Sequence, residues 1–285
     1  MHVKDVYAYK PFYQFFILDN NNNLYTTYNS EDKLFLSSDP GVYFTMIYSN
    51  VTKFESRGNT VAIIINSRCY LLGDNASGQL GTGNTGEIIT QPLDTGIDNV
   101  VDFYISSTNV FLVTSDGTIY AAGDNSSGQL GLTKSSVLYF TPISITNPKK
   151  IVIDENANYI LTKDGDLYIS GTPLNTKTGV AGISSVPQFT KINGSNLIKD
   201  FKVKMGDILA YTYKNSLYAL GNDITGKLGL NNQDVDVLTR INIGFVETLI
   251  TDIYLEDTFS FIIDNKNILM SSGTVPVGES IWKIN

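Results

Sequence analysis

Carboxylates make up almost all of the side chains with which this 285-residue chain could do acid–base or metal chemistry. The sequence has 28 Asp and Glu residues, but one cysteine, Cys69, and one histidine, His2. Zinc sites and Ser-His-Asp triads need cysteine or histidine in a rigidly held position, which a histidine at the second residue does not offer. We therefore expect no metal, no cofactor and no nucleophilic triad, and a lone cysteine excludes a disulfide within the chain.

A pair of carboxylates is the one catalytic arrangement that this composition leaves open. A glycoside hydrolase needs two acids that face each other across a cleft. The acidic residues outside any repeated pattern are scattered over predicted loops and strand ends, so we expect solvated charges and no enzyme. They are Glu87, Asp94, Asp98, Asp154, Glu155, Glu247, Glu256 and Asp257. A carboxylate-based glycan hydrolase, or a glycan-binding module, is kept as an alternative.

The charge and hydropathy of the chain argue against two kinds of partner. With 20 Lys and Arg against 28 Asp and Glu, the net charge is −8, which disfavours binding to a nucleic-acid backbone. The longest apolar runs, such as Val61–Ile65, fall far short of the ~18 residues of a membrane span. The first ten residues contain Lys4, Asp5 and Lys10 and lack the apolar core of a signal peptide. We expect no nucleic-acid partner, no membrane partner and a cytoplasmic location.

An internal repeat organises the sequence. Gly73–Gly81 reads Gly-Asp-Asn-Ala-Ser-Gly-Gln-Leu-Gly and starts 50 residues before its near-copy, Gly123–Gly131. A third copy is Gly221–Gly229, and a degraded copy begins at Gly171. Six anchor residues recur at spacings of 45 to 52 residues, and they are Tyr25, Tyr70, Tyr120, Tyr168, Tyr218 and Met270. Six modules therefore fill residues 1–285, which predicts a single domain.

Each module has the pattern of four short strands. In the third module these are Val100–Ile105, Val110–Thr114, Thr118–Ala122 and Thr141–Ile145. Four strands per repeat of this length are typical of a β-propeller blade. The sequence thus predicts an all-β fold, a single β-propeller of four-stranded antiparallel blades, with six blades favoured and seven as the alternative. The first and last residues match the opening and the end of a module, so we expect the N- and C-terminal strands to close the ring.

Turn geometry accounts for the Gly-Asp-Asn segment without a ligand. Glycine suits positive φ or a close backbone approach, Asp and Asn suit hydrogen bonds to nearby backbone, Gln can bridge two backbones, and Leu can point inward. A calcium loop would need alternating acidic positions, and a phosphate loop a following Gly-Lys-Ser/Thr. We expect structural turn roles for Gly73, Asp74, Asn75, Gly78, Gln79, Leu80, Gly81, Gly123, Asp124, Asn125, Gly128, Gln129, Leu130, Gly131, Gly221, Gly226, Leu228 and Gly229. The module-start acids Asp5, Asp102, Asp200 and Asp252 should bond backbone or link neighbouring blades.

The longest form of the repeat, residues 116–131, resembles the repeat of the regulator of chromosome condensation family. It reads Asp-Gly-Thr-Ile-Tyr-Ala-Ala-Gly-Asp-Asn-Ser-Ser-Gly-Gln-Leu-Gly. The resemblance implies a propeller, usually seven-bladed, that serves as a platform for protein partners. The founding member's nucleotide-exchange activity needs a wedge inserted in one blade, and its chromatin docking needs a basic tail. Neither is visible in this sequence, so we do not carry those activities over.

Aromatic residues outside the repeat pattern are the candidate partner contacts, because exposed tyrosines on a loop face are typical of binding hot spots. They are Tyr43, Phe44, Tyr48, Tyr139 and Phe140. We predict a non-catalytic interaction or structural module that binds protein partners through its loop faces. Abundant Asn with few Arg suggests an AT-rich bacterial or viral genome, so a subunit of a larger homo- or hetero-assembly, including a virion or phage particle, is one form of this prediction. An inhibitor that occludes a partner enzyme's active site, as one bacterial relative does, is the alternative.

Overall fold

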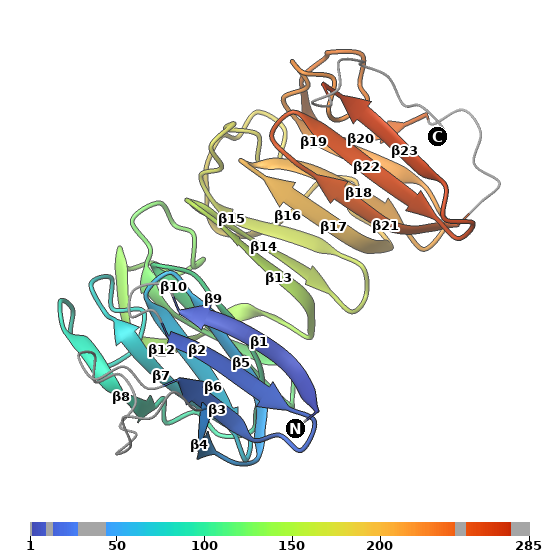
Figure 1. Ribbon diagram of the computed structural model, residues 1–285. Coiled ribbons are helices and arrows are strands. Elements are labelled where there is room, and N and C mark those ends of the chain that lie inside the picture. Colours follow the sequence, from blue (N-terminus) through green and yellow to red (C-terminus); the bar gives the residue numbers. More distant parts are fainter. Residues whose placement is uncertain (1, 10–13, 28–43, 243–248, 275–285) are drawn as a thin grey trace. The chain divides into compact units, whose positions relative to one another are not determined.

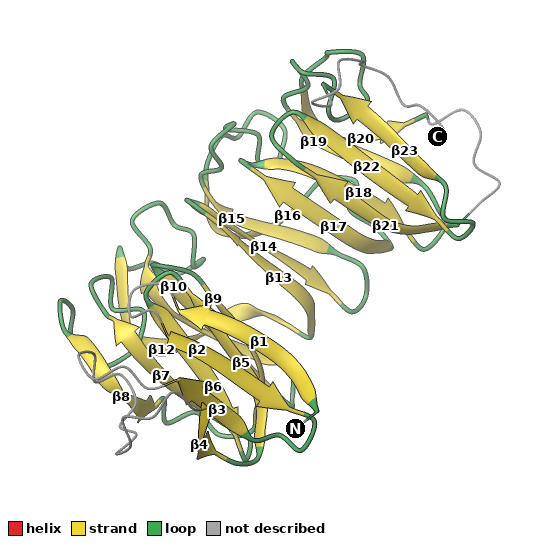
Figure 2. Ribbon diagram, viewed as in Figure 1, coloured by secondary structure: helices red, strands yellow, loops and turns green. Residues whose placement is uncertain are grey.

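The computed structural model describes residues 2–9, 14–27, 44–242 and 249–274 (Figure 1). All regular structure in these ranges is β-strand, from β1 to β23 (Figure 2). Within the same ranges no helix is long and apolar enough to cross a membrane.

The strands form six antiparallel sheets, each a meander in chain order; five have four strands and the last has three. Sheets 1 to 3 are β1 (Val3–Tyr9), β2 (Gln14–Asp19), β3 (Leu24–Thr27) and β4 (Phe44–Tyr48); β5 (Val51–Arg57), β6 (Thr60–Ile65), β7 (Arg68–Asp74) and β8 (Ile88–Asp94); and β9 (Val100–Ile105), β10 (Asn109–Thr114), β11 (Thr118–Asp124) and β12 (Ser136–Thr146). Sheets 4 to 6 are β13 (Pro148–Asp154), β14 (Ala157–Thr162), β15 (Leu167–Gly171) and β16 (Val186–Lys191); β17 (Ile198–Lys204), β18 (Asp207–Thr212), β19 (Leu217–Gly221) and β20 (Val235–Ile241); and β21 (Ile250–Leu255), β22 (Phe259–Asp264) and β23 (Leu269–Gly273). The prediction of four-stranded antiparallel modules is confirmed for five repeats, and Trp282–Ile284, predicted to end the sixth, lies outside the described residues.

Local turn chemistry explains why the strands reverse where they do. Between β10 and β11, the Thr114 hydroxyl donates to Asp116 Oδ1 at 2.6 Å, and the same oxygen accepts the Thr118 N–H at 3.0 Å. Gly117 follows at φ 86°, a conformation that glycine adopts without strain. The sequence Thr-Ser-Asp-Gly-Thr therefore specifies this hairpin by itself.

The described strands group into two compact units. Unit 1 comprises Met1–Ser126 and Lys134–Thr146, and unit 2 comprises Ser127–Thr133 and Asn147–Asn285. Unit 1 carries 13 acidic and 7 basic residues, whereas unit 2 carries 15 acidic and 13 basic residues, so the acidic excess is concentrated in unit 1. Closure of the six sheets into one ring, and their status as one domain, stay predictions.

The hydrophobic cores lie between consecutive sheets of a unit. In β18, Ile208 and Ala210 pack in one core with β14 and β17, while Leu209 joins a second core with β21 and β22. In unit 1, alternate side chains of β6 likewise belong to two different cores. Strand residues alternate between two faces, so a sheet that is buried on both faces requires a largely apolar second strand, and β10, β14 and β18 are buried along their whole length.

Ion pairs join the first strands of consecutive sheets. Lys53 Nζ lies 2.5 Å from Asp102 Oδ1 and donates to the Phe103 carbonyl oxygen at 2.8 Å. Lys150 makes the corresponding contacts with Asp200, at 2.6 Å, and with the next carbonyl. Asp102, Asp200 and Asp252 each also accept the N–H of the following residue. For these three aspartates, the predicted backbone or inter-sheet role is confirmed.

Candidate functional site: the loops of unit 2

The repeat loop, the nine-residue segment that starts at the glycine near the end of the third strand, begins with a close backbone approach. Gly73 has φ 110°, and a Cβ atom there would lie 1.9 Å from the Asn59 carbonyl oxygen. Gly123 has φ 121°, with a Cβ atom 2.1 Å from the Thr108 carbonyl oxygen. Positive φ recurs at Gly78, Gly81, Gly128, Gly131, Gly221, Gly226 and Gly229. No other residue type fits at Gly73 and Gly123, because the obstacle is backbone.

Side-chain hydrogen bonds shape the rest of the loop. In the second repeat, Asp74 Oδ1 accepts the Ala76 N–H at 2.9 Å, and Asn75 Oδ1 accepts the Leu80 N–H at 3.0 Å. The Asn75 amide donates to the Asn84 carbonyl at 2.9 Å. In the third repeat, Asp124 and Asn125 occupy the same loop positions. Asp124 accepts a backbone N–H, and the side-chain amide of Asn125 donates to a backbone carbonyl. Leu80, Leu130 and Leu228 are fully buried.

The loops of repeats 2 and 3 pack on the sheet that follows in the chain. Gln79 Oε1 accepts the Ser77 N–H, and its amide donates to the Ser107 carbonyl between β9 and β10 at 2.9 Å. The carbonyl of Gln129 accepts the Asn158 side-chain amide at 2.9 Å. Gly128 and Gly131 lie against Pro187 and Phe189 in the same manner. These loops are therefore occupied by contacts within the protein.

Repeats 4 and 5, both in unit 2, depart from this pattern at the loop tip. The fourth loop position is Ala76 in repeat 2 and Ser126 in repeat 3, but Leu174 in repeat 4 and Ile224 in repeat 5. Leu174 is 43% exposed and Ile224 is 78% exposed. A small or polar tip residue has thus been replaced by a large apolar side chain that faces solvent.

Met205 adds a third exposed apolar side chain at a position that disfavours it. The two-residue turn Met205-Gly206 joins β17 to β18, with φ 53° and 85°, the positive values of a type I′ hairpin turn. Asn-Gly is the preferred sequence there, and a bulky residue at positive φ costs about 1–2 kcal/mol. Met205 is nevertheless 50% exposed and gains little packing. Strain without a packing benefit points to a functional requirement.

These three residues surround a pocket of about 250 Å³. Its lining residues are Leu174, Asn175, Met205, Asp207, Asn222, Ile224, Thr225, Lys227 and Asp257. The exposed apolar side chains form the rim, and the buried Asp207 and Lys227 form the floor. The volume is below the ~300–1,000 Å³ typical of small-molecule sites, so the pocket fits one side chain of a macromolecule better than a free ligand.

The floor is a buried ion pair that replaces neutral residues of other repeats. Lys227 Nζ lies 2.7 Å from Asp207 Oδ2 and donates to the Asp257 carbonyl at 3.1 Å. Lys227 occupies the place of Gln79 and Gln129, and Asp207 that of Asn109 at the start of the second strand. Asp207 Oδ1 accepts the Asn175 amide at 2.6 Å and the Asn222 N–H at 2.8 Å. The lysine keeps the bridging role of the glutamine, and the aspartate neutralises the charge it brings.

Asp223 replaces Asn75 and Asn125 in repeat 5; its Oδ1 keeps the acceptor role of Asn75 Oδ1, and its Oδ2 accepts where the Asn75 amide nitrogen donates. Its carboxylate accepts the N–H groups of Leu228 at 2.6 Å and Leu230 at 2.7 Å, and also that of Asn232. Burial, assisted by the charge of Asp207, raises the pKa of Asp223 above its usual range despite these bonds. The carboxylate is fully engaged by the loop, so it serves structure.

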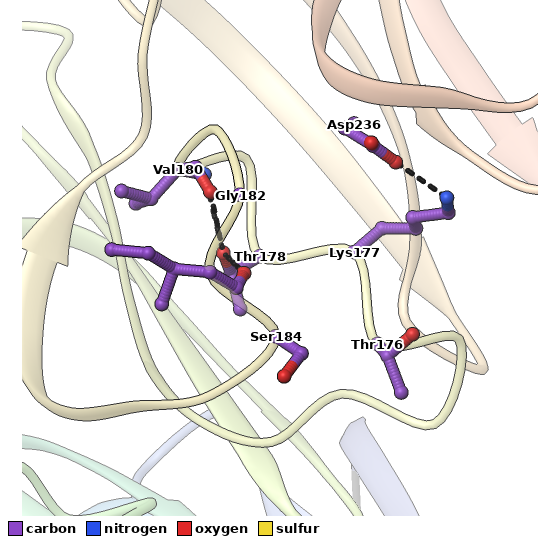
Figure 3. A pocket seen from close by; sticks show the side chains of 8 residues that line it. Thr176, Lys177, Thr178, Val180, Gly182, Ser184 and Asp236 are labelled. Carbon is purple, nitrogen blue, oxygen red and sulfur yellow. Dashed lines mark hydrogen bonds and ion pairs between the residues drawn. The ribbon is translucent and has the colours of Figure 1, made fainter.

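A second pocket, of about 200 Å³, lies in the degraded loop of repeat 4 (Figure 3). Lys177 pairs with Asp236 at its edge, and the Thr178 hydroxyl donates to the Ile183 carbonyl at 2.5 Å. Thr176 has φ 59°, which is strained for a β-branched residue. Both pockets thus border the loop of repeat 4, which lacks the Gly-x-Leu-Gly ending of repeats 2, 3 and 5.

Four of the five aromatic residues predicted to bind a partner lie in unit 1, on the outer strands β4 and β12 of two different sheets. Tyr139 is 67% exposed and Phe44 is also exposed, whereas Tyr48 packs partly against the core between sheets 1 and 2. Phe140 is half-buried against Gly81 of the preceding repeat loop. Tyr43 lies outside the described residues. Their role in binding stays a prediction.

Leu174, Met205 and Ile224 were not predicted from the sequence. The signal for two of them was present: the fourth loop position changes from Ala or Ser to Leu or Ile between repeats. Met205 was not recognisable, because its strain appears only with its φ value. Among the described residues, no group of three His, Cys, Asp or Glu side chains could hold a metal ion.

Comparisons with known proteins identify the fold. No sequence family matches the chain, and no curated protein matches it. Among solved structures, human WBSCR16 superposes with a TM-score of 0.69 at 15% identity, covering 92% of this chain and 74% of that chain. Yeast RCC1 (Prp20), bound to Kap60, gives 0.65 at 16% identity, covering 92% and 68%. Prp20p from Saccharomyces cerevisiae, studied for its binding to Gsp1p and histones, gives 0.64 at 16% identity, covering 92% and 70%.

The class defined by these matches is the β-propeller. More narrowly, the chain has the fold of the RCC1-like propellers, which confirms the resemblance seen in residues 116–131.

Proposed function

We propose that the protein is a non-catalytic interaction module that binds another protein through the loop surface of unit 2. This surface comprises the loop 171–185, the turn 205–206 and the loop 222–236. The observation that carries the proposal is the set of three exposed apolar residues, Leu174, Met205 and Ile224, around one pocket. Two of them break the repeat pattern and one is held at a strained φ, so all three are retained against structural preference.

The fold neighbours support an interaction role. Yeast RCC1 (Prp20) is seen bound to Kap60, and the same protein has been studied for its binding to Gsp1p and histones. At least one protein of this fold therefore takes protein partners. The identity of those partners is not transferred to this chain. The proposal treats residues 1–285 as one propeller domain, and it assigns the repeat-loop glycines and polar residues to structure.

A carboxylate hydrolase has weaker support at this surface. Asp207 and Asp257 line the pocket, but Asp207 accepts from Lys227, Asn175 and the Asn222 N–H. A carboxylate held in this way is not available as a general acid or nucleophile. An enzyme-occluding inhibitor would be one case of the proposed binding, and a virion or other assembly another; the identity of the captured partner distinguishes them.

The experiment is a pull-down from native extract with three baits and mass-spectrometric identification. The baits are the wild type, the variant Leu174→Ser/Met205→Asn/Ile224→Ser, and the control Phe44→Ser/Tyr139→Ser in unit 1. We expect one stoichiometric protein that the wild type and the control retain and the unit 2 variant loses. Each substitution in the unit 2 variant restores a repeat or turn residue, so the bait should stay folded. Loss with the unit 1 variant alone would place the interface on β4 and β12 and contradict the proposal.

A further inference from the structure

We propose that the pocket above Asp207 and Lys227 receives an arginine side chain of the partner protein. This inference rests on the proposed function, because it assumes that a protein docks on the loop surface of unit 2. It goes further by specifying the chemistry of the group that the pocket recognises.

Two oxygen atoms at the pocket lack a hydrogen-bond partner. They are the buried atoms Asn222 Oδ1 and Thr225 Oγ1 of two lining residues. Buried polar atoms are nearly always paired in native proteins. The buried ammonium of Lys227 is engaged by Asp207 and by the Asp257 carbonyl. A hydrogen-bond donor would satisfy both oxygen atoms, because the Asn222 amide oxygen only accepts and the Thr225 hydroxyl can accept.

The charge beside the pocket favours a cationic donor. Lys227 neutralises Asp207 within the floor. At the edge, Lys204 Nζ lies 3.3 Å from Glu256 and 3.7 Å from Asp257, so one ammonium serves two exposed carboxylates. Glu256 and Asp257 together therefore keep one negative charge in excess, and Asp257 lines the pocket. A cation that enters the pocket would neutralise this negative charge, whereas a carboxylate would be repelled by it.

Arginine meets these requirements better than lysine. Its planar guanidinium carries five donors in a fixed fork and can reach several acceptors at once. Its aliphatic stem can pack along Leu174, Met205 and Ile224 while the head reaches the polar floor. Protein interfaces are also enriched in arginine and depleted in lysine.

The test is a selection of random dodecapeptides on phage against the immobilised full-length chain. We expect enriched peptides to share an arginine flanked by apolar residues. The best peptide is then synthesised with arginine, lysine or citrulline at that position, and its affinity is measured by calorimetry. Citrulline keeps the shape and loses the charge, so we expect binding about tenfold weaker or more.

The variant Thr225→Val distinguishes a role of Thr225 in peptide binding from a role in stability alone. It removes the unpaired hydroxyl and keeps the side-chain shape, so we expect weaker binding of the arginine peptide but a higher urea midpoint of unfolding. A purely structural Thr225 would not move the two readouts in opposite directions. Tyr139→Ser, in unit 1, is the control and should leave the peptide affinity unchanged.

The outcomes distinguish the two proposals. Peptides that need Ile224 and Met205 but bind equally with arginine or citrulline would overturn the arginine inference and leave the docking surface in place. Peptides that bind Leu174→Ser/Met205→Asn/Ile224→Ser as well as wild type, or a selection with no enrichment, would count against both.

Discussion

Asp207 and Lys227 form a buried ion pair of 2.7 Å where the third repeat has Asn109 and Gln129. Both changes are needed together. A lysine in place of the glutamine brings a charge into a buried site, and an aspartate in place of the asparagine neutralises it. In repeat 5 the charges of the two substituted residues thus compensate each other. This pair forms the floor of the proposed docking pocket.

Removing one member of this pair should be more damaging than removing both. We expect Asp207→Asn or Lys227→Gln alone to lower the free energy of unfolding by about 3–5 kcal/mol, because each leaves an uncompensated buried charge. The double variant restores the residues of the third repeat and should recover most of that loss. Urea unfolding followed by circular dichroism measures all three. Additive losses in the double variant would contradict the coupling.

The glycine that opens each repeat loop gives a second prediction. A Cβ atom at Gly123 would lie 2.1 Å from the Thr108 carbonyl oxygen, so Gly123→Ala must displace backbone as well as strain φ. Gly96 also has positive φ, at 74°, but a Cβ atom there meets nothing within 4 Å. We expect Gly96→Ala to cost about 1 kcal/mol and Gly123→Ala clearly more, by at least about 2 kcal/mol. Similar unfolding midpoints for the two variants would show that the close approach relaxes freely.

Much of the fold was predictable because its determinants are local and repeated. The expected strands Val100–Ile105 and Thr118–Ala122 agree with β9 and β11, whose turn residues and apolar runs lie side by side in the sequence. The expected strand Thr141–Ile145 lies within the longer β12 (Ser136–Thr146). The repeat makes each strand and turn easier to predict, because the same sequence pattern recurs in several modules.

The candidate site was less predictable, because its determinants are not local. Asp207 and Lys227 meet across twenty residues of sequence, and the pairing is visible only when the repeats are aligned on the structure. Tyr139 and Phe140 are adjacent aromatic residues, yet one is exposed and the other covers Gly81, a difference that the strand direction and the next sheet decide. The strain at Met205 is a backbone property that no composition rule reveals.

Acid should weaken the hairpin between β10 and β11. Hydrogen bonds from the Thr114 hydroxyl and the Thr118 N–H lower the pKa of Asp116 in the folded state. A carboxylate with a lowered folded pKa contributes stability above its unfolded pKa, about 3.9, and loses that contribution as pH falls through the folded pKa. We expect Asp116→Asn to be less stable than wild type at pH 7, with the difference shrinking below about pH 4. Unfolding curves at several pH values measure this, and a difference independent of pH would refute the linkage.

We expect Met205 to lower the stability of the protein and to raise its affinity for the partner. Met205→Asn creates the Asn-Gly sequence that a type I′ turn prefers, and it relieves a bulky residue at φ 53°. We expect the free energy of unfolding to rise by about 1 kcal/mol and the affinity for the captured partner to fall. Glu155→Ser, at the corresponding turn between β13 and β14, is a matched control that should leave the partner's affinity unchanged. A Met205→Asn protein that is less stable than wild type would show that the methionine is retained for packing, and the argument from strain to function would then fail.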